Sequence, residues 1–275
     1  MGQAGRFDIL KTMAKIKLSG KDLVVFDLDG TLTPSKSPLE PSMARALMAL
    51  LVKKRVAVIG GGSWAQFRKQ FLGSFDCPRE LLPNLFLFPT TATSFYRYRK
   101  GWKNVYEMKL SPRERTAIKR AFREVMREIG YVPPAKTYGK VIEDRGSQIT
   151  FSALGQDVVA RLGKRGLALK EKWRRENTPV KARMAKLLAE RLPNLEVHPS
   201  AFTSIDVTRK GIDKAYGVLQ IERYLHVPVA RMVFVGDALF KGGNDAAAKR
   251  TGVDCIPVRG PKDTEKIIEQ IIDLP

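Results

Sequence analysis

Val24-Val25-Phe26-Asp27-Leu28-Asp29-Gly30-Thr31-Leu32-Thr33 joins a short apolar run to a turn that carries two aspartates. The apolar run predicts a buried parallel strand, and such a strand delivers its carboxyl end to the ligand crevice of an open α/β sheet. We therefore expect Asp27 and Asp29 at the mouth of a site, with their side chains on the same side of the chain. Two carboxylates this close repel each other unless a cation lies between them or one is protonated. A plain turn is the alternative, because Asp-Gly-Thr is favourable turn chemistry.

The composition is that of an ordinary globular protein. The 275 residues suffice for one large or two modest domains, and 44% of them are hydrophobic. Cys77 and Cys255 lie far apart in the sequence, which excludes a disulfide framework and indicates a reducing, cytoplasmic compartment. No apolar run approaches the roughly 18 residues of a membrane span, so we expect no membrane association. Residues 1–19 lack the apolar core of a signal peptide and are interpreted as an N-terminal extension.

The net charge is +21, and it is concentrated in the middle of the chain. Residues 91–207 contain 25 Lys and Arg against 12 Asp and Glu. Such a charge fits either a nucleic-acid partner or a solvated basic surface that attracts anionic substrates. No zinc-ligand spacing, aromatic ribonucleoprotein motif or repeat accompanies the charge. Nucleic acid is therefore the less favoured partner.

Two α/β segments flank a middle region of different character. Short apolar runs predict core strands at residues 23–26, 56–59, 85–88, 232–236 and 255–258. Amphipathic periodicity predicts core helices at residues 41–53, 64–71, 210–224 and 261–272. This alternation is typical of a doubly wound parallel sheet.

The middle region predicts antiparallel strands and helices. It contains a hairpin over 95–106, a long helix from the capping box at Ser111 to about Ile129, and strands at 140–143, 148–152, 195–198 and 204–207. Residues 163–178 are polar and poorly periodic, so we expect a loop with some helix there, followed by a helix over 180–192. The predicted fold class is α/β: a doubly wound core of residues 20–90 and 208–275, with an inserted cap of antiparallel sheet plus helices at 91–207.

Polar residues follow the predicted core strands. Gly60-Gly61-Gly62-Ser63 lies between a strand and a helix, where backbone N–H groups and a hydroxyl could face an anion, although a glycine-rich turn is an alternative. Asp237 ends another strand, and Gly242-Gly243-Asn244-Asp245 follows it. Lys214 lies on a predicted helix. Several carboxylates with one lysine are the set that metal-assisted phosphoryl transfer requires.

In this order, the stretches resemble the motifs of the haloacid dehalogenase superfamily. The resemblance implies that Asp27 attacks a phosphoryl group and becomes an aspartyl phosphate. It implies that Asp29 protonates the leaving oxygen and later activates the acceptor. Ser63 would hold the phosphate, and Lys214 would pin Asp27 and the phosphate.

The same resemblance implies a Mg²⁺ cofactor. Asp27, the backbone carbonyl of Asp29, and Asp237 would ligate the ion. Asp245 would be a direct or water-mediated ligand. Asn244 would touch the phosphate or a ligand.

Past residue 20, the chain more closely resembles the eukaryotic-type phosphomannomutases of the superfamily's type-IIB cap group. The matching stretches are residues 27–34, 61–63, 142–145, 204–207, 213–214, 236–237 and 242–245. In that family the cap binds the distal phosphate of a hexose bisphosphate and meets the sugar hydroxyls. Arg145, Ser204 and Asp206 fall on those positions, and Lys36 falls where the family has an arginine. The resemblance therefore implies a phosphorylated sugar as the partner.

One departure from the family decides the predicted reaction. Gln156 stands where the family has a second cap arginine. A mutase must rebind its bisphosphate intermediate in two orientations and needs a firm second phosphate grip, whereas a phosphatase needs only water at Asp29. We therefore predict a Mg²⁺-dependent type-IIB hydrolase that acts as a phosphatase on a hexose phosphate. The alternatives are a phosphomannomutase interconverting mannose 6-phosphate and mannose 1-phosphate, and a nucleic-acid- or polyanion-binding protein. A homodimer is left open.

Overall fold

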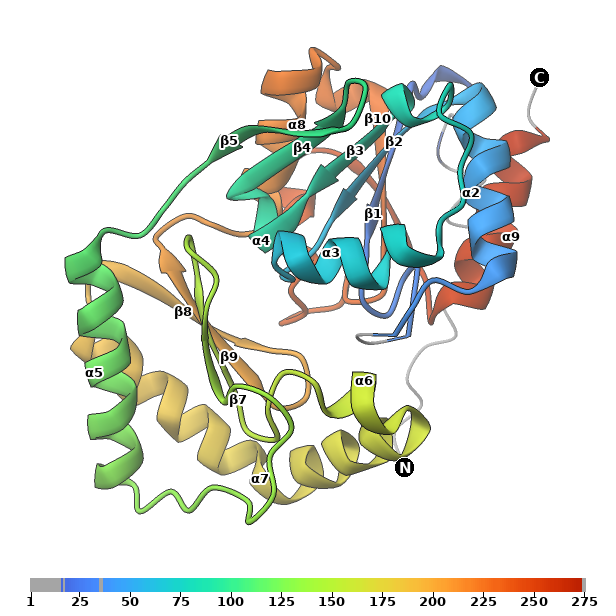
Figure 1. The fold of residues 1–275 in the computed structure, drawn as a ribbon. Coiled ribbons are helices and arrows are strands. Elements are labelled where there is room, and N and C mark those ends of the chain that lie inside the picture. The colour runs from blue at the N-terminus through green and yellow to red at the C-terminus, as the bar shows by residue number, and fades with distance from the viewer. Residues whose placement is uncertain (1–15, 17, 35–36, 274–275) are drawn as a thin grey trace. The chain divides into compact units, whose positions relative to one another are not determined.

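The computed structural model describes residues 16, 18–34 and 37–273, which form two compact units. The core unit contains residues 18–34, 38–106 and 213–273, and the cap unit contains residue 37 and residues 107–212. Most of the predicted N-terminal extension lies outside the described residues. The α/β fold class is confirmed, because helices flank a mainly parallel sheet in one unit and an antiparallel sheet lies in the other (Figure 1).

A seven-stranded sheet with the order β11-β10-β1-β2-β3-β4-β5 forms the centre of the core unit. Its strands are β1 (Leu23–Asp27), β2 (Arg55–Ile59), β3 (Leu85–Phe88), β4 (Ser94–Tyr98), β5 (Trp102–Glu107), β10 (Met232–Gly236) and β11 (Asp254–Pro257). β1 pairs in parallel with both β2 and β10, while β4 runs antiparallel to β3. The carboxyl ends of β1, β2 and β10 therefore meet at one edge, which places the residues that follow them close together.

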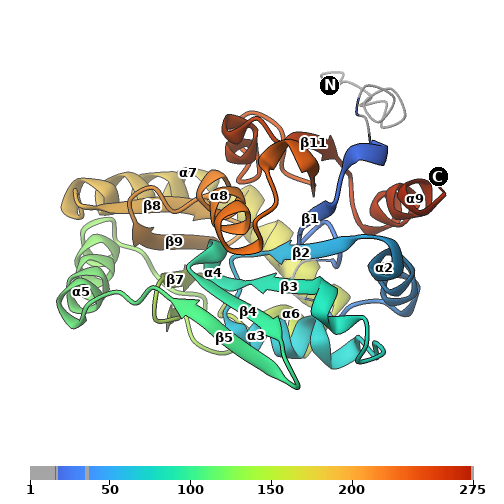
Figure 2. The ribbon, with the colours of Figure 1, turned by 90° about the horizontal axis from the view of Figure 1, so that it is seen from above.

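Alternate residues of these strands are buried on opposite faces of the sheet. Val24 and Phe26 pack in one apolar cluster, and Leu23 and Val25 pack in another. The first cluster is completed by α2 (Pro41–Lys53), α3 (Trp64–Gln70) and α9 (Pro261–Ile272), and the second by α8 (Lys214–Leu225). α2 and α9 lie side by side in both views (Figures 1 and 2). Helices on both faces explain why the strands read as continuous apolar runs.

Short elements connect the core strands and helices. They are the 3₁₀ helices η1 (Leu18–Gly20), η2 (Leu72–Ser74), η3 (Leu82–Asn84), η4 (Val229–Arg231) and η5 (Ala246–Thr251), and the turn α4 (Pro89–Ala92). None of the helices among the described residues combines the length and the apolar character needed to cross a membrane.

The cap unit contains a four-stranded antiparallel sheet with the order β6-β7-β9-β8. Its elements are β6 (Ile142–Asp144), β7 (Ile149–Ser152), β8 (Leu195–Ser200), β9 (Ser204–Arg209), α5 (Pro112–Glu128), α6 (Val158–Leu162) and α7 (Lys164–Arg191). Phe151 and Val207 lie in one apolar cluster with Phe122 of α5 and Leu188 of α7. Two helices thus cover one face of this sheet, as the alternation of its strands requires.

The structure differs from the sequence-based expectation in two segments. β4 and β5, which we assigned to the cap from residue 91 onward, extend the core sheet, and the core resumes at residue 213 rather than 208. The loop with some helix predicted over residues 163–178 is instead helical throughout from Lys164, because α7 begins there and continues through Pro179. Over residues 164–178 this helix buries only Gly166, Lys170 and Trp173, so its sequence carries little apolar periodicity.

The packing of α2 gives a test of the core. Leu47 is fully buried, whereas Val52 on the same helix is 69% exposed. We expect Leu47→Ala to lower the free energy of unfolding by about 2–5 kcal/mol, because it leaves a cavity. Val52→Ala should change it by less than about 0.5 kcal/mol. Denaturant unfolding followed by circular dichroism measures both; equal losses would contradict this packing.

The start of α5 gives a test that depends on pH. Ser111 and Glu114 form a capping box, and both carboxylate oxygens of Glu114 also accept hydrogen bonds from Arg209, at 3.0 and 3.1 Å. The hydrogen bonds from Arg209, then those from Ser111, outweigh burial and lower the pKa of Glu114 from 4.5 to about 2. A depressed pKa in the folded state gives stability that is present above pH about 4.5 and is lost as the pH falls towards 2.

We therefore expect wild-type protein to be more stable than Glu114→Gln at pH 6, with the difference shrinking between pH 4.5 and 2. Urea unfolding of both proteins at a series of pH values measures this difference. A constant difference across that range would show that the carboxylate charge contributes nothing.

Candidate active site

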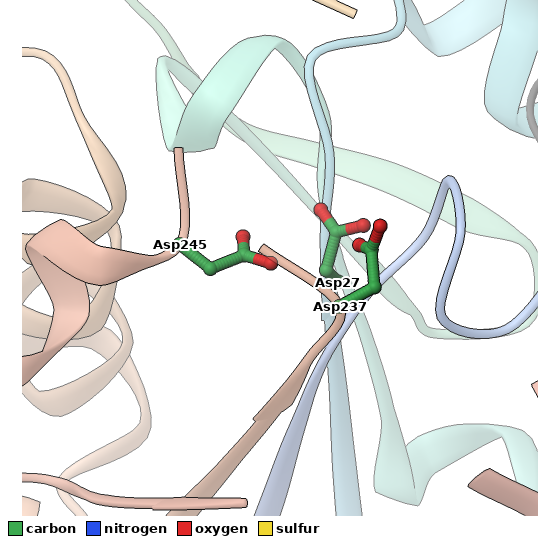
Figure 3. Close-up of side chains that lie close together, drawn as sticks. All are labelled: Asp27, Asp237 and Asp245. Atoms are coloured by element: carbon green, nitrogen blue, oxygen red, sulfur yellow. The ribbon is translucent and has the colours of Figure 1, made fainter. Parts of the chain in front are cut away.

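Three aspartates converge at the carboxyl edge of the core sheet. Asp27 ends β1, Asp237 follows β10, and Asp245 precedes η5. One carboxylate oxygen of each lies within 4.8 Å of the others. Figure 3 shows the three side chains close together. The sheet order brings them together, because β1 and β10 are hydrogen-bonded neighbours.

Lys214, the first residue of α8, joins this acidic group. Its Nζ atom forms a hydrogen-bonded ion pair with Asp27 and lies 3.3 Å from Oδ1 of Asp245. It also donates a hydrogen bond to the backbone carbonyl of Ile59, at 3.0 Å. The lysine side chain is only 3% exposed. A buried ammonium is tolerated when it is paired and hydrogen-bonded in this way.

The carboxylates outnumber the ammonium, and burial magnifies the imbalance. Burial, opposed by Lys214, together with the charges of Asp245 and Asp237, raises the pKa of Asp27 well above its ordinary value. Burial and the neighbouring Asp245 raise the pKa of Asp237 to about 6. Burial acts to lower the pKa of Lys214, but Asp27 and Asp245 outweigh it and keep that pKa above its ordinary value. The site therefore favours a further cation.

The three aspartates fit a metal ion. Oδ1 of Asp245 is buried and lies 3.3 Å from Nζ of Lys214, while Oδ2 accepts a hydrogen bond from the Ala238 amide at 3.0 Å. A Cβ atom at Gly30 would lie 2.5 Å from Asp237, and one at Gly236 would lie 2.5 Å from Asp245. The two glycines thus leave room for the carboxylates to approach. Oxygen-only ligands suit hard divalent cations.

Asp29 lies outside this group of three. Its Oδ1 atom accepts a hydrogen bond from Nε2 of Gln70 at 2.8 Å, and the same amide donates to the Thr33 hydroxyl at 2.8 Å. The side chain is therefore held by a residue of α3. The backbone carbonyl of Asp29 as a metal ligand stays a prediction.

Two residues that support the aspartates were not identified from the sequence. Gln70 holds Asp29, and Thr31 contacts Asp237: the Asp237 amide donates to the Thr31 hydroxyl at 3.0 Å, and that hydroxyl donates to Oδ1 of Asp237 at 3.3 Å. Thr31 carried a usable signal, because it belongs to the Asp-Gly-Thr turn. Gln70 carried none, since its role depends on the direction in which α3 leaves its loop.

Ser63 is the N-cap of α3, and its hydroxyl accepts a hydrogen bond from the Gln66 amide at 3.3 Å. The glycine-rich loop before it is fixed by α4, where Thr90, Thr91 and Ala92 have positive φ angles of 49°, 55° and 60°. The amides of Thr90 and Thr91 donate to the carbonyls of Gly62 and Gly60, each at 2.9 Å. A left-handed run of non-glycine residues costs energy and persists only where its surroundings determine it.

The structure does not test the roles of two residues predicted to contact the phosphate. Asn244 is exposed, next to the buried Asp245. Lys36 lies outside the described residues. Their predicted roles stay predictions.

The remaining predicted residues lie on the polar face of the cap sheet. Asp206 is paired with Thr150 across β7 and with His198 across β8, and the Thr150 hydroxyl donates to Oδ1 of Asp206 at 2.6 Å. Ser204 is buried and lies on the same strand, two residues earlier. This face carries side chains that can bind polar groups, whereas the opposite face packs on α5 and α7.

Arg145 contacts the residue that marks the departure from the family pattern. Its Nε atom donates to Glu143 at 2.7 Å, and its Nη2 atom donates to Oε1 of Gln156 at 3.0 Å. The arginine side chain is 4% exposed. Gln156 thus accepts a hydrogen bond from the guanidinium, where a second arginine would repel it.

The arrangement in the core unit is suited to nucleophilic displacement at a phosphoryl group. Asp27 offers a buried carboxylate whose raised pKa makes it a stronger base and nucleophile. Lys214 supplies a fixed positive charge beside it. Asp29, two residues on, is held separately by Gln70 and can exchange a proton.

Comparison with known proteins agrees with this interpretation. The family model for eukaryotic phosphomannomutase matches residues 43–274. A phosphomannomutase of Encephalitozoon cuniculi is 27% identical over 261 residues, which cover 92% of this chain and 94% of that protein. A phosphomannomutase of Saccharomyces cerevisiae is 25% identical over 261 residues, with the same coverage.

Solved structures support the fold. An IMP-nucleotidase of Plasmodium falciparum superposes with a TM-score of 0.69 at 14% identity, covering 96% of this chain and 71% of that chain. A trehalose-6-phosphate phosphatase of Aspergillus fumigatus superposes with a TM-score of 0.55 at 17% identity, covering 98% of both chains. At these identities the likeness concerns the fold alone.

The aspartate group gives a test that does not depend on activity. A ligand that binds only the folded state raises its stability, so MgCl₂ or MnCl₂ should raise the melting temperature of the wild-type protein. Asp237→Asn should abolish most of this rise, because it removes one of three carboxylate ligands. Asp76→Asn, at an exposed position outside the group, should retain it. An equal rise in all three proteins, measured by thermal unfolding with and without EDTA, would contradict a metal site here.

Proposed function

Because this chain belongs to the eukaryotic phosphomannomutase family of the haloacid dehalogenase superfamily, we propose that it interconverts mannose 6-phosphate and mannose 1-phosphate. It is an enzyme of that superfamily, and the curated relatives support this reaction over the hydrolase that Gln156 suggested. The single observation that carries the proposal is the buried ion pair of Asp27 and Lys214 beside Asp237 and Asp245.

The first half of the reaction uses Asp27 as the nucleophile. A carboxylate oxygen of Asp27 attacks phosphorus, the bond from phosphorus to the sugar oxygen breaks, and an aspartyl phosphate forms. Asp29 gives its proton to the departing sugar oxygen, which leaves as a hydroxyl group. Gln70 holds the Asp29 carboxyl for this step, through its 2.8 Å hydrogen bond.

The second half returns the phosphoryl group to a sugar. Asp29 now removes a proton from the accepting hydroxyl, whose oxygen attacks phosphorus and releases Asp27. Lys214 stays protonated, because Asp27 and Asp245 raise its pKa above the ordinary value, and it offsets negative charge on the phosphoryl oxygens. In the proposal, Ser63 and the amides of the glycine-rich loop bind those oxygens.

We propose Mg²⁺ as the metal, with Asp27, Asp237, Asp245 and the Asp29 carbonyl as its ligands. When bound, it would neutralise the surplus carboxylate charge and polarise the phosphoryl group. The clustering of three carboxylates around the single ammonium of Lys214 supports this assignment.

In the cap unit, we assign sugar and phosphate binding to Arg145, Ser204 and Asp206. Asp206 can accept hydrogen bonds from sugar hydroxyls, since Thr150 occupies only one of its oxygens in the described contacts. Lys36 and Asn244 are further candidates for the phosphate.

A phosphatase is the second candidate, and the contact between Arg145 and Gln156 favours it. Arg145 donates to Glu143 and Gln156, so part of its guanidinium is engaged within the protein. A weaker grip on a second phosphate would let the first sugar leave and water attack the aspartyl phosphate. We place the enzyme in the cytoplasm, keep nucleic acid as the less favoured partner, and leave a homodimer open.

A paired assay decides between the two reactions. Mannose 1-phosphate is incubated with MgCl₂, with and without glucose 1,6-bisphosphate, while isomer exchange and phosphate release are followed together. We expect exchange that depends on the bisphosphate. Phosphate release without exchange would replace the mutase by the phosphatase, and neither signal would overturn both.

Asp27→Asn tests the covalent step. The amide is a poor nucleophile, so turnover should fall by at least about 10³-fold, a typical cost of losing a residue that acts covalently. Asp76→Asn serves as the matched control and should retain activity. Circular dichroism establishes that both proteins are folded. Full activity of Asp27→Asn would contradict the aspartyl-phosphate mechanism.

A further inference from the structure

Three cations lie along one side of α7, in the stretch from Lys170 to Lys181. Arg174 and Lys181 follow Lys170 by four and eleven positions, which in a helix of about 3.6 residues per turn places all three within a narrow stripe. Lys170 is 1% exposed, Lys181 is half-buried, and Arg174 is exposed. We call these three residues the α7 cation stripe.

The stripe meets the turn between β8 and β9. The Lys170 ammonium and the Arg174 guanidinium lie over the ring of Phe202, at 6.0 and 4.4 Å from its centroid. Lys181 donates hydrogen bonds to the carbonyls of Ser200, at 3.2 Å, and Ala201, at 2.7 Å. Side chains that are stacked or hydrogen-bonded in this way lose little further freedom when they bind a ligand.

The charges around Lys181 do not balance. Burial lowers the pKa of Lys181 to about 8; Asp206 opposes this shift, whereas Lys170 and Arg174 add to it. Two cations and one carboxylate therefore act on this ammonium. An anion placed here would relieve the repulsion among the three cations.

Groups suited to sugar hydroxyls border the stripe. The negative charge of Asp206 raises the pKa of Lys181, against the effect of burial. Asp206 also pairs with His198 across β8 and β9. The buried Nε2 atom of His198 has no hydrogen-bond partner among the described residues. A carboxylate and an imidazole beside a cationic stripe can bind a molecule that carries hydroxyl groups next to an anionic group.

We propose that Lys170, Arg174 and Lys181, with Phe202 behind them, form an anion subsite that takes a phosphate group of a phosphorylated sugar. The subsite rests on the proposed function for its ligand, and it supplies the second phosphate grip that Gln156 does not. Phosphate suits it because an arginine can donate two parallel hydrogen bonds and a lysine adds a point charge. The subsite residues belong to the cap unit, whereas Asp27 belongs to the core unit.

Calorimetric titration of the full-length chain with glucose 1,6-bisphosphate tests the subsite. Asp27→Asn is the background, because it cannot form the phosphoenzyme and leaves the ligand intact. In that background, Arg174→Met and Lys181→Met are made singly and together. The matched control carries Arg175→Met and Lys186→Met, which remove the same charge from exposed positions on the other side of α7.

We expect the double variant to weaken bisphosphate binding by roughly 10- to 100-fold, given the usual strength of charged hydrogen bonds. The control should weaken it by less than about 3-fold, because distant exposed charges are screened. Lys181→Arg should restore most of the affinity. Arg174→Met alone guards against misfolding, since Arg174 is exposed, and it should show part of the loss.

Two results would overturn the subsite: equal affinities of the double variant and the control, or a loss confined to inorganic phosphate with glucose 6-phosphate and the bisphosphate unaffected. The proposed function fails separately. Bisphosphate binding that depends on the stripe, without isomer exchange in wild-type protein, would leave the subsite in place and remove the mutase. The same double variant and control are also made in protein that keeps Asp27. Isomer exchange at equal rates in these two proteins would do the reverse: it would leave the mutase in place and remove the subsite.

Discussion

The ion pair between Lys214 and Asp27 is the interaction on which the candidate active site depends. The two residues are 187 positions apart, and the cap segment lies between them in the sequence. Neither charge is stable alone in the interior, so each requires the other to be delivered to the same place. Because Lys214 also donates to the carbonyl of Ile59, one ammonium ties β1, β2 and α8 together. The core segments before and after the cap are thereby joined at the carboxyl edge of the core sheet.

The same edge stores unfavourable energy that a ligand can release. Three carboxylates, of which those of Asp27 and Asp245 are buried and that of Asp237 is half-buried, face one ammonium. The pKa of Asp237 rises to about 6 through burial and the charge of Asp245. The left-handed turn at Thr90 and Thr91 adds backbone strain beside the glycine-rich loop. Such costs are borne where the surrounding sheet is rigid, and here the strands beneath the site are fully buried. A cation and a phosphate would offset the first cost directly.

The features that could be predicted from the sequence are those encoded by residues close together in the chain. Asp27 and Asp237 were found because a strand's carboxyl end is visible as the end of an apolar run, and the parallel order then brings such ends together. The helix over residues 164–178 could not be found, since its buried positions include a glycine and a lysine. Gln70 and the contact of Gln156 with Arg145 depend on tertiary directions that no spacing encodes. The sequence therefore identified the aspartates and the lysine that the structure brings together, but not the residues that hold them in place.

The charge of the cap unit has two parts with different consequences. On the outer surfaces, cations such as Arg120 and Lys186 are exposed and meet carboxylates one helical turn away, at 3.8 and 4.0 Å. Ion pairs of this kind contribute little to stability. The net excess of cations over carboxylates attracts anions over a distance of about a Debye length. Lys170 and Lys181 are withdrawn from solvent and fixed against the turn at Phe202. Charges held in this second way are suited to orienting a ligand, because their side chains lose little conformational entropy when the ligand binds. A solvated side chain loses more, and this loss offsets much of the attraction. The basic composition and the α7 cation stripe thus have different roles in the proposal. The net positive charge attracts an anion to the cap, and the stripe binds its phosphate group at a defined position.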